Sequence, residues 1–157
     1  MNLTKTDSGF SPIPFQIREG DLAGALTVAE QIQEFENPYG KAEYRRRLKA
    51  VNHLILTAVM GAEPVAFKVG YDRFGDGSFY SWMGGVLNQY RRQGLAGMLA
   101  NYQEQWARCQ GYQYLRMKTL RRHNGMLQFA LKRGFSIIRI SPKKQEQQTI
   151  IWLEKSL

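Results

Sequence analysis

The chain has 157 residues, of which 43% are hydrophobic, and a formal net charge of +9 at pH 7. This length suits one compact domain with its own core, and no apolar run approaches the roughly 20 residues of a membrane-spanning helix. The only cysteine, Cys109, excludes an internal disulfide. Because the start lacks a signal-like apolar segment, we expect a cytoplasmic protein with a flexible arm at residues 1–12 and a single domain at residues 13–157.

The positive charge is concentrated in the second half of the chain. Residues 1–80 carry a net charge of −1, whereas residues 81–157 carry +10. Such an excess suits a polyanion such as nucleic acid, a multiply phosphorylated cofactor, or simply a solvated basic face. Charge alone leaves these three alternatives open.

Hydrophobic periodicity and turn residues predict the elements of the first half. After a short strand at residues 14–18, Asp21 is a favourable N-cap for a helix whose apolar face extends to Ile32. The turn at residues 35–40 separates this helix from a second, basic helix at residues 41–50. Three strands joined by turns follow, at residues 53–60, 65–71 and 79–87.

The second half alternates helices and strands. A helix at residues 95–110 has its apolar residues at spacings of three and four. A strand at residues 112–120 is followed by a polar turn at residues 121–125 and by a short helix at residues 126–133, which ends at a glycine. The two last strands lie at residues 135–140 and 149–153. Hairpins followed by helical crossovers predict an α/β fold, in which helices pack against a mixed sheet.

The turn between Leu87 and Leu95 is the most informative stretch. It leads from a strand into a helix, so it presents free backbone N–H groups and the positive end of the helix dipole. An anion, most naturally a phosphate, is the expected ligand. The small residues Gly94, Ala96 and Gly97 would let a pyrophosphate approach the backbone closely. The alternative is that glycine merely eases the turn.

The strand before this turn contains Gly84-Gly85, although glycine weakens strands. A bulge, or the close approach of a ligand with amide groups, would explain the pair. The chain contains neither the G-x-x-x-x-G-K-[ST] nor the G-x-G-x-x-G fingerprint, so a Walker-type or dinucleotide site is not supported.

Three motifs in order resemble those of the GNAT superfamily of acyl-CoA-dependent N-acetyltransferases. Arg91-x-x-Gly94-x-Ala96 is similar to the family's Q/R-x-x-G-x-G/A turn. The segment before it resembles the V-x-P-x-Y-R lead-in, with Asn88 where proline is common. Asn124, followed by a helix that ends in Gly134-Phe135, resembles the second family signature. The resemblance covers the chain from Phe15 to Leu153.

The resemblance implies a mixed, mostly antiparallel central sheet that is flanked by helices and splayed at its central strands, with acetyl-CoA as co-substrate. The cofactor-binding residues it implies are Gly84, Val86, Arg91, Arg92, Gln93, Gly94, Ala96, Gly97 and Asn124. Backbone groups of Gly84 and Val86 would pair with the pantetheine arm, the N–H groups of residues 92–97 would hold the pyrophosphate, and Asn124 would contact the arm from the other side. Arg121 and Arg122 are candidates for an outer phosphate. No metal site is implied.

The implied reaction is direct attack of a primary amine on the thioester within a ternary complex. The amine must be neutral, which costs roughly 4.6 kcal/mol for a lysine-like amine at pH 7, so a proton acceptor is needed. The strand at residues 79–87 offers no Asp, Glu or His. Glu34 and Glu36, in the loop that lines the family's acceptor site, are the candidates. Many members place a tyrosine as general acid where this chain has Leu131 or Ala130.

The acceptor implied is an amine-bearing small molecule, peptide or protein, and a homodimer is possible. No membrane or nucleic-acid partner is expected. Aromatic residues between Phe35 and Trp82 could line an acceptor pocket or belong to the core. Two other functions stay open at this point: a CoA-binding regulatory module without turnover, and a nucleic-acid-binding protein.

Overall fold

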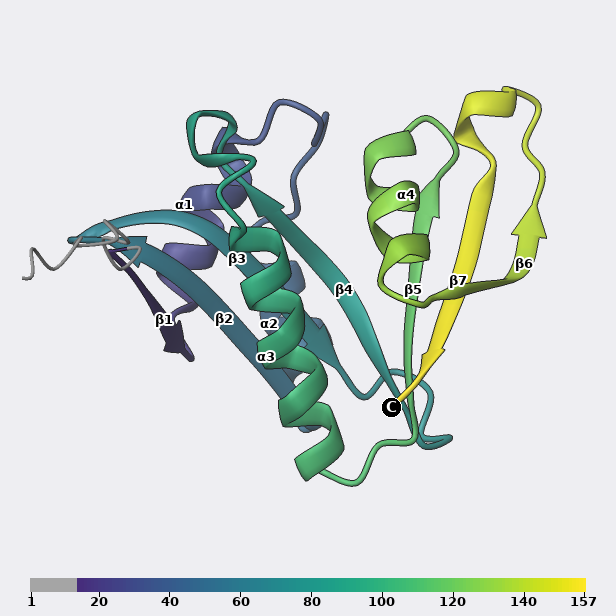
Figure 1. Cartoon of the computed structure of the whole chain (residues 1–157), viewed down its shortest axis with the longest axis horizontal. Coiled ribbons are helices and arrows are strands. Elements are labelled where there is room, and N and C mark those ends of the chain that lie inside the picture. The colour runs from purple at the N-terminus through teal and green to yellow at the C-terminus, as the bar shows by residue number, and fades with distance from the viewer. Residues whose placement is uncertain (1–13) are drawn as a thin grey trace, which may run out of the picture.

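The computed structural model describes residues 14–157, so the predicted arm at residues 1–12 lies outside the described residues. One seven-stranded sheet runs in the order β1-β2-β3-β4-β5-β7-β6, with α3 and α4 on one face and α1 and α2 on the other (Figure 1). The strands are β1 (Phe15–Glu19), β2 (His53–Met60), β3 (Glu63–Tyr71), β4 (Ser78–Val86), β5 (Tyr114–Leu120), β6 (Ser136–Ser141) and β7 (Ile150–Ser156). The helices are α1 (Leu22–Gln31), α2 (Lys41–Leu48), α3 (Leu95–Cys109) and α4 (Asn124–Lys132), with short 3-10 helices η1 (Asn88–Tyr90) and η2 (Glu146–Gln148).

The α/β architecture and the order of elements predicted from the sequence are confirmed. Each predicted helix and strand is present, with ends that differ by up to three residues. The local signals explain this agreement: the Asp21 side chain accepts a hydrogen bond from the Gly24 N–H at 2.9 Å, and Gly134 adopts a φ of +92° after α4. Asn124, expected in the preceding turn, is the first residue of α4.

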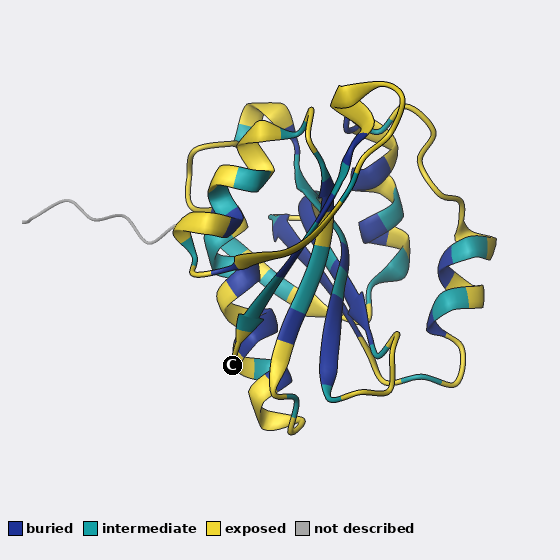
Figure 2. Ribbon diagram, turned by 90° about the vertical axis from the view of Figure 1, so that its right-hand side faces the viewer, coloured by how far each residue is buried: buried dark blue, intermediate teal, exposed yellow. Residues whose placement is uncertain are grey.

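Two apolar clusters hold the helices against the two faces of the sheet. Leu95 and Leu99 of α3 pack with one face, and Val28 of α1 packs with the other. Each of these side chains is almost fully buried, which stabilises the fold by roughly 1.5–3 kcal/mol per residue. Buried residues concentrate along the central strands and the inner sides of the helices (Figure 2).

The sheet opens between its two central strands. β4 and β5 run parallel but pair only over Ser78–Tyr80 and Tyr114–Arg116; beyond these residues the two strands diverge (Figure 1). We call the space between residues 81–86 of β4 and residues 117–120 of β5 the V. Along the V, the edge of β4 that faces β5 has no strand partner among the described residues. The predicted splaying of the central strands is thus present.

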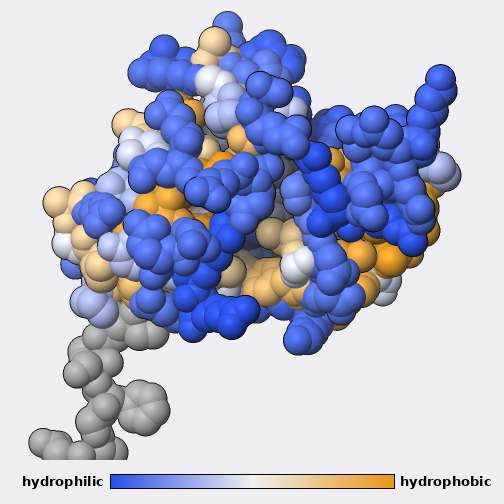
Figure 3. Space-filling view, turned by 90° about the horizontal axis from the view of Figure 1, so that it is seen from above, coloured by the Kyte–Doolittle hydropathy of each residue, from blue (hydrophilic) through white to orange (hydrophobic). Residues whose placement is uncertain are grey.

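A β-bulge marks the point where the strands separate. Val69 of β3 is opposite Met83, whereas the next residue, Gly70, is opposite Ser81, so Trp82 is the extra residue of β4. A bulge bends its strand and increases the local twist, which directs β4 away from β5. The bulge therefore lies at Trp82 and not at the Gly84-Gly85 pair. The surface above the V is mainly hydrophilic, with apolar atoms recessed between polar side chains (Figure 3).

Candidate active site

The N-terminus of α3 lies just beyond the end of β4 and has no side-chain cap. Gly94, the N-cap residue, has a φ of +85° and accepts this conformation because it lacks a Cβ. Arg92 also adopts a positive φ, +61°, at a cost of about 1–2 kcal/mol for a residue with a side chain. No hydrogen bond from a described side chain caps this end, so the first N–H groups of α3 remain available to an anion.

The guanidinium of Arg91 is already engaged. Its Nε donates to the Val86 carbonyl at 3.0 Å, and its two terminal nitrogens donate to the Glu34 carboxylate at 2.7 and 3.0 Å. Arg91 thus joins the turn before α3 to the loop after α1. Arg91 was expected among the cofactor-binding residues; in the structure its charge is shared with Glu34.

The same ion pair sets the chemistry of Glu34. Hydrogen bonds from Arg91 lower the pKa of the Glu34 carboxyl from 4.5 to about 2. Glu34 is therefore ionised throughout the neutral pH range, and a carboxylate of such low pKa is a weak proton acceptor. Its contacts suit the role of a positioning group for the turn.

Glu36 and its partner Arg122 lie on opposite sides of the V. The Arg122 guanidinium donates to the Glu36 carboxylate at 3.1 Å, which connects the loop after α1 to the loop after β5. Glu36 is 70% exposed. Burial and the nearby Arg122 lower the pKa of His123, while Glu34 and Glu36 oppose that effect, so these charged groups are close neighbours. Arg121 points elsewhere and pairs with Glu146 at 2.7 Å.

The two adjacent glycines of β4 serve different purposes. A Cβ on Gly85 would lie 2.2 Å from the Ile32 Cδ1 atom, so Gly85 lets α1 pack against the sheet. Gly84 pairs with Lys68 of β3, and a Cβ there would come no closer than 3.3 Å, to the Phe67 carbonyl. Gly84 thus leaves the strand bare on the side that faces α3, where a ligand arm would run. Asn124 begins α4 after β5, on the other side of the V.

A small cavity of about 20 Å³ lies where the V closes, between α3, α4 and strands β3–β5. It is large enough for one water molecule. Gln103 is fully buried beside it, and neither polar atom of its amide has a hydrogen-bond partner within the described chain.

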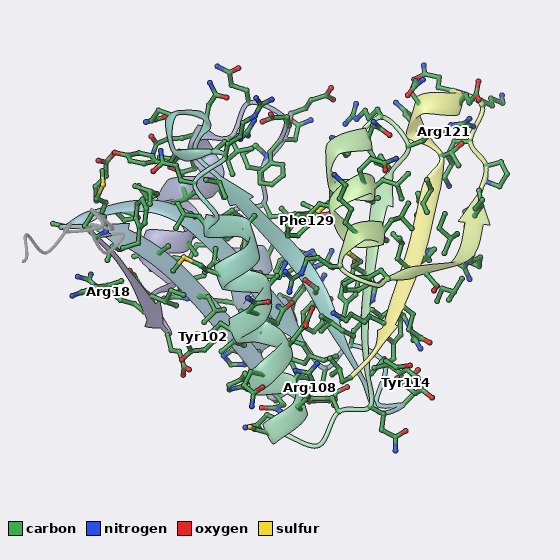
Figure 4. The ribbon with its side chains drawn as sticks, viewed as in Figure 1. Arg18, Tyr102, Arg108, Tyr114, Arg121 and Phe129 are labelled. Carbon is green, nitrogen blue, oxygen red and sulfur yellow. The ribbon has the colours of Figure 1, made fainter. Side chains whose placement is uncertain are left out.

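Phe129 projects from α4 into the space beside β4 (Figure 4). Of the two residues expected at the tyrosine position, Ala130 lines the cavity with its methyl group, whereas Leu131 is 38% exposed.

Charged groups surround this cavity. Glu104 is only 7% exposed and accepts from Arg133 at 3.2 Å and from Lys155 at 3.0 Å, which connects α3 to the end of α4 and to β7. Lys68 lines the same cavity, and burial together with nearby Arg133 lowers its pKa to about 8. This cluster was not recognised from the sequence. Its one local signal was Lys68, a charged residue between Ala66 and Gly70 on the inward side of β3.

Comparison with known proteins agrees with this geometry. The sequence matches the family model described as the Acetyltransferase (GNAT) family over residues 25–135. No curated protein gives a significant match to the chain.

Solved structures of similar fold come from several organisms. Ard1 from Thermoplasma volcanium is 17% identical, with a TM-score of 0.78, over 92% of this chain and 99% of its own. The ribosomal-protein-S18-alanine N-acetyltransferase from Escherichia coli is 15% identical, with a TM-score of 0.76, over 90% and 93%. A GNAT family acetyltransferase from Elizabethkingia anophelis, solved with acetyl-CoA bound, is 17% identical, with a TM-score of 0.73, over 92% and 99%. At these identities the likeness concerns the fold.

The family model covers most of the chain, and it includes β4, the turn before α3, and α4 up to Phe135. These are the elements that build the V and the uncapped helix end. The protein belongs to the GNAT family of acetyltransferases.

Proposed function

We propose that this protein transfers an acetyl group from acetyl-CoA to a primary amine. The observation that carries the proposal is the V, with an uncapped helix N-terminus at its end. A bare strand edge beside Gly84 suits a ligand arm with amide groups, and the free N–H groups of α3 suit a pyrophosphate. The residues present therefore fit acetyl-CoA.

The proposed contacts come from both sides of the V. Backbone groups of Gly84 and Val86 would pair with the pantetheine arm, the N–H groups of residues 92–97 would hold the pyrophosphate, and Asn124 would contact the arm from α4. The bound co-substrate supplies a thioester, whose carbonyl carbon is the electrophile. Arg91 would contribute to cofactor binding indirectly, by fixing the position of the turn before α3, because its guanidinium is paired with Glu34.

The proposed chemistry is direct transfer. The amine nitrogen bonds to the thioester carbon, the carbon–sulfur bond breaks, the nitrogen loses one proton and the sulfur leaves as thiolate. Positioning supplies much of the rate, and a β4 N–H near Gly84 would stabilise the developing oxyanion. We assign the acceptance of the amine's proton to Glu36, directly or through water, because Glu36 is exposed and held by one ion pair, whereas the low pKa of Glu34 disfavours that role.

The test is product formation. Purified protein is incubated with acetyl-CoA and a panel of primary amines, and free thiol and acetylated amine are quantified together, the latter by mass spectrometry. We expect thiol and acetylated amine in equal amounts, with little thiol when the amine is omitted. Binding of acetyl-CoA without any product, across a broad panel, would contradict the proposal and favour a CoA-binding regulatory module. Nucleic-acid binding that persists at moderate salt, without acetyl-CoA binding, would favour the third alternative.

A further inference from the structure

We infer that the amine acceptor carries a carboxylate or phosphate group a few bonds from its nitrogen. The inference rests on the proposed function and concerns the face of the sheet opposite α3 and α4. Because those two helices cover the other face (Figure 1), the amine reaches the V from the side of α1 and α2. The side chains on that side decide which amines are accepted.

Aromatic rings form a continuous wall across this side of the V. Starting from the loop before α2, ring centroids are 5.4 Å apart for Tyr39 and Trp82, 5.7 Å for Trp82 and Tyr71, and 5.7 Å for Tyr71 and Tyr80. Tyr80 is then 6.0 Å from Trp152 on β7. The wall therefore extends from the β3–β4 half of the sheet to the β5–β7 half. Trp82 and Tyr80 are buried, whereas Tyr39 is 42% exposed.

Cationic side chains from four different elements lie on these rings. The Arg47 guanidinium, from α2, is 4.6 Å from the Trp82 centroid, and that of Arg73, from the β3–β4 loop, is 4.9 Å from Tyr80. Lys118 of β5 and Arg139 of β6 are 5.4 and 5.6 Å from the Trp152 centroid. Contact with aromatic faces holds such cations in place without neutralising them. The remaining charge is available to a ligand.

Most of this positive charge has no matching carboxylate. Arg47 pairs with Glu43, but Arg73, Lys118 and Arg139 form no ion pair with any residue of the described range 14–157. Burial, followed by the charges of Arg73, Arg47 and Lys143, lowers the pKa of Lys118. The groups that act on Lys118 are thus all positive, and an anion placed among them would relieve their mutual repulsion.

The position of Lys118 relates this charge to the reacting centre. Arg116 is the last β5 residue that pairs with β4, and Lys118 is the next residue on the same side of β5, so it lies at the start of the V. An amine at the closed end of the V would therefore have its remaining atoms among Lys118, Arg73 and the Trp152 ring. Guanidinium groups bind carboxylate and phosphate through two parallel hydrogen bonds. This arrangement favours an acceptor in which the anionic group is close to the amine.

The experiment compares amines that differ only in the anionic group. The pairs are an α-amino acid with its amide, and O-phosphoethanolamine with ethanolamine, all assayed with saturating acetyl-CoA; the two pairs distinguish carboxylate from phosphate. We expect kcat/KM at least tenfold higher for the anionic member of one pair. An amide lowers the pKa of the neighbouring amine, so a preference for the acid cannot arise from a larger neutral fraction.

Variants assign the preference to these residues. Lys118→Met and Arg73→Gln should reduce kcat/KM about tenfold for the anionic member and leave the uncharged member and the KM for acetyl-CoA nearly unchanged. Lys118→Glu should shift the preference towards diamines. Lys132→Met, at an exposed position on α4, is the matched control and should change nothing. Melting temperatures establish that each variant is folded.

The outcomes separate the inference from the proposed function. If uncharged or cationic amines are acetylated as well as anionic ones, the inference is wrong and the function stands. If acetyl-CoA binds and no amine of any kind is acetylated, the proposed function fails. If an anionic preference exists but survives Lys118→Met and Arg73→Gln, this surface is not its origin and the inference is likewise wrong.

Discussion

Arg91 and Glu34 form a two-point ion pair between residues that are 57 positions apart in the sequence. The pair connects the turn before α3 to the loop after α1, so the part of the molecule proposed to bind phosphate and the part proposed to face the acceptor are mechanically joined. Both side chains are partly exposed, at 38% and 47%, so the direct contribution to stability is small, about 1 kcal/mol or less. The main effect of the pair is on the position of the turn.

Replacing Glu34 tests this positioning role. The folded-state pKa, about 2, is below the ordinary value of 4.5, so the pair's stability is present above pH 4.5 and is lost as pH falls towards 2. Glu34→Gln should therefore cost up to about 1 kcal/mol at pH 7 and almost nothing near pH 2, as measured by urea unfolding. Above pH 5 the pH–rate profile should keep its shape, because Glu34 does not titrate there.

Glu36→Gln is the matched comparison, because Glu36 lies in the same loop and has the proposed proton-accepting role. It should lower kcat with little change in the KM for acetyl-CoA. The opposite result, in which Glu34→Gln lowers kcat and Glu36→Gln does not, would exchange the two roles.

A substitution at Gly94 tests whether the turn before α3 binds the phosphates of acetyl-CoA. Gly94→Val places a branched side chain at a φ of +85°, which strains the backbone by about 1–2 kcal/mol and covers the N–H groups of α3. Gly111→Val applies similar strain at the opposite end of the same helix, where φ is +90° and, as at Gly94, a Cβ would meet no atom within 4 Å. Both variants should lose similar stability, and only Gly94→Val should lose acetyl-CoA binding by calorimetry. Equal binding losses in the two variants would show that strain, and not the turn, is responsible.

Replacement by alanine should affect stability at Gly85 and acetyl-CoA binding at Gly84. Gly85→Ala directs its Cβ to within 2.2 Å of the Ile32 Cδ1 atom and should destabilise the fold by about 1–3 kcal/mol. Ile32→Val removes that atom, so the double variant should regain part of the loss, which a double-mutant cycle measures. Gly84→Ala should affect stability less and raise the KM for acetyl-CoA. Strict additivity of Gly85→Ala and Ile32→Val would contradict the assigned contact.

Lys68 should make the free energy of unfolding depend on pH. Its folded-state pKa, about 8, is below the ordinary 10.5, so the folded protein binds fewer protons than the unfolded chain between these values and its stability rises with pH. Lys68→Met should be more stable than the wild type at pH 7, by up to about 3 kcal/mol, and the difference should shrink as pH rises from 8 to 10.5. A difference that is constant with pH, in comparison with Lys132→Met as control, would contradict this.

The features that could be predicted from the sequence are those set by residues close together along the chain. Alternation and glycine placement identified every strand and α-helix, and the motif around Gly94 identified the helix end. Side-chain partners across the sheet could not be predicted. The pairing of Arg91 with Glu34 and the reason for Gly85, which is Ile32, both require the position of α1 on the sheet.

The same limit applies to the charged clusters. Lys68 meets Arg133 and Glu104 only because α3 and α4 pack over β3, and the cations on Trp152 come from the β3–β4 loop, β5 and β6. The bulge at Trp82 is also a tertiary feature, set by the register between β3 and β4. Charge counts along the sequence located an excess after residue 81 without showing which face carries it.

Acetyl-CoA is proposed to bind along β4 and across the N-terminus of α3. Amide hydrogen exchange with and without acetyl-CoA measures this directly. We predict protection of residues 84–86 and 92–97, the same amides unprotected in Gly94→Val, and little change in α2. Protection that falls elsewhere, or none in these two segments while acetyl-CoA is bound, would contradict this mode of binding.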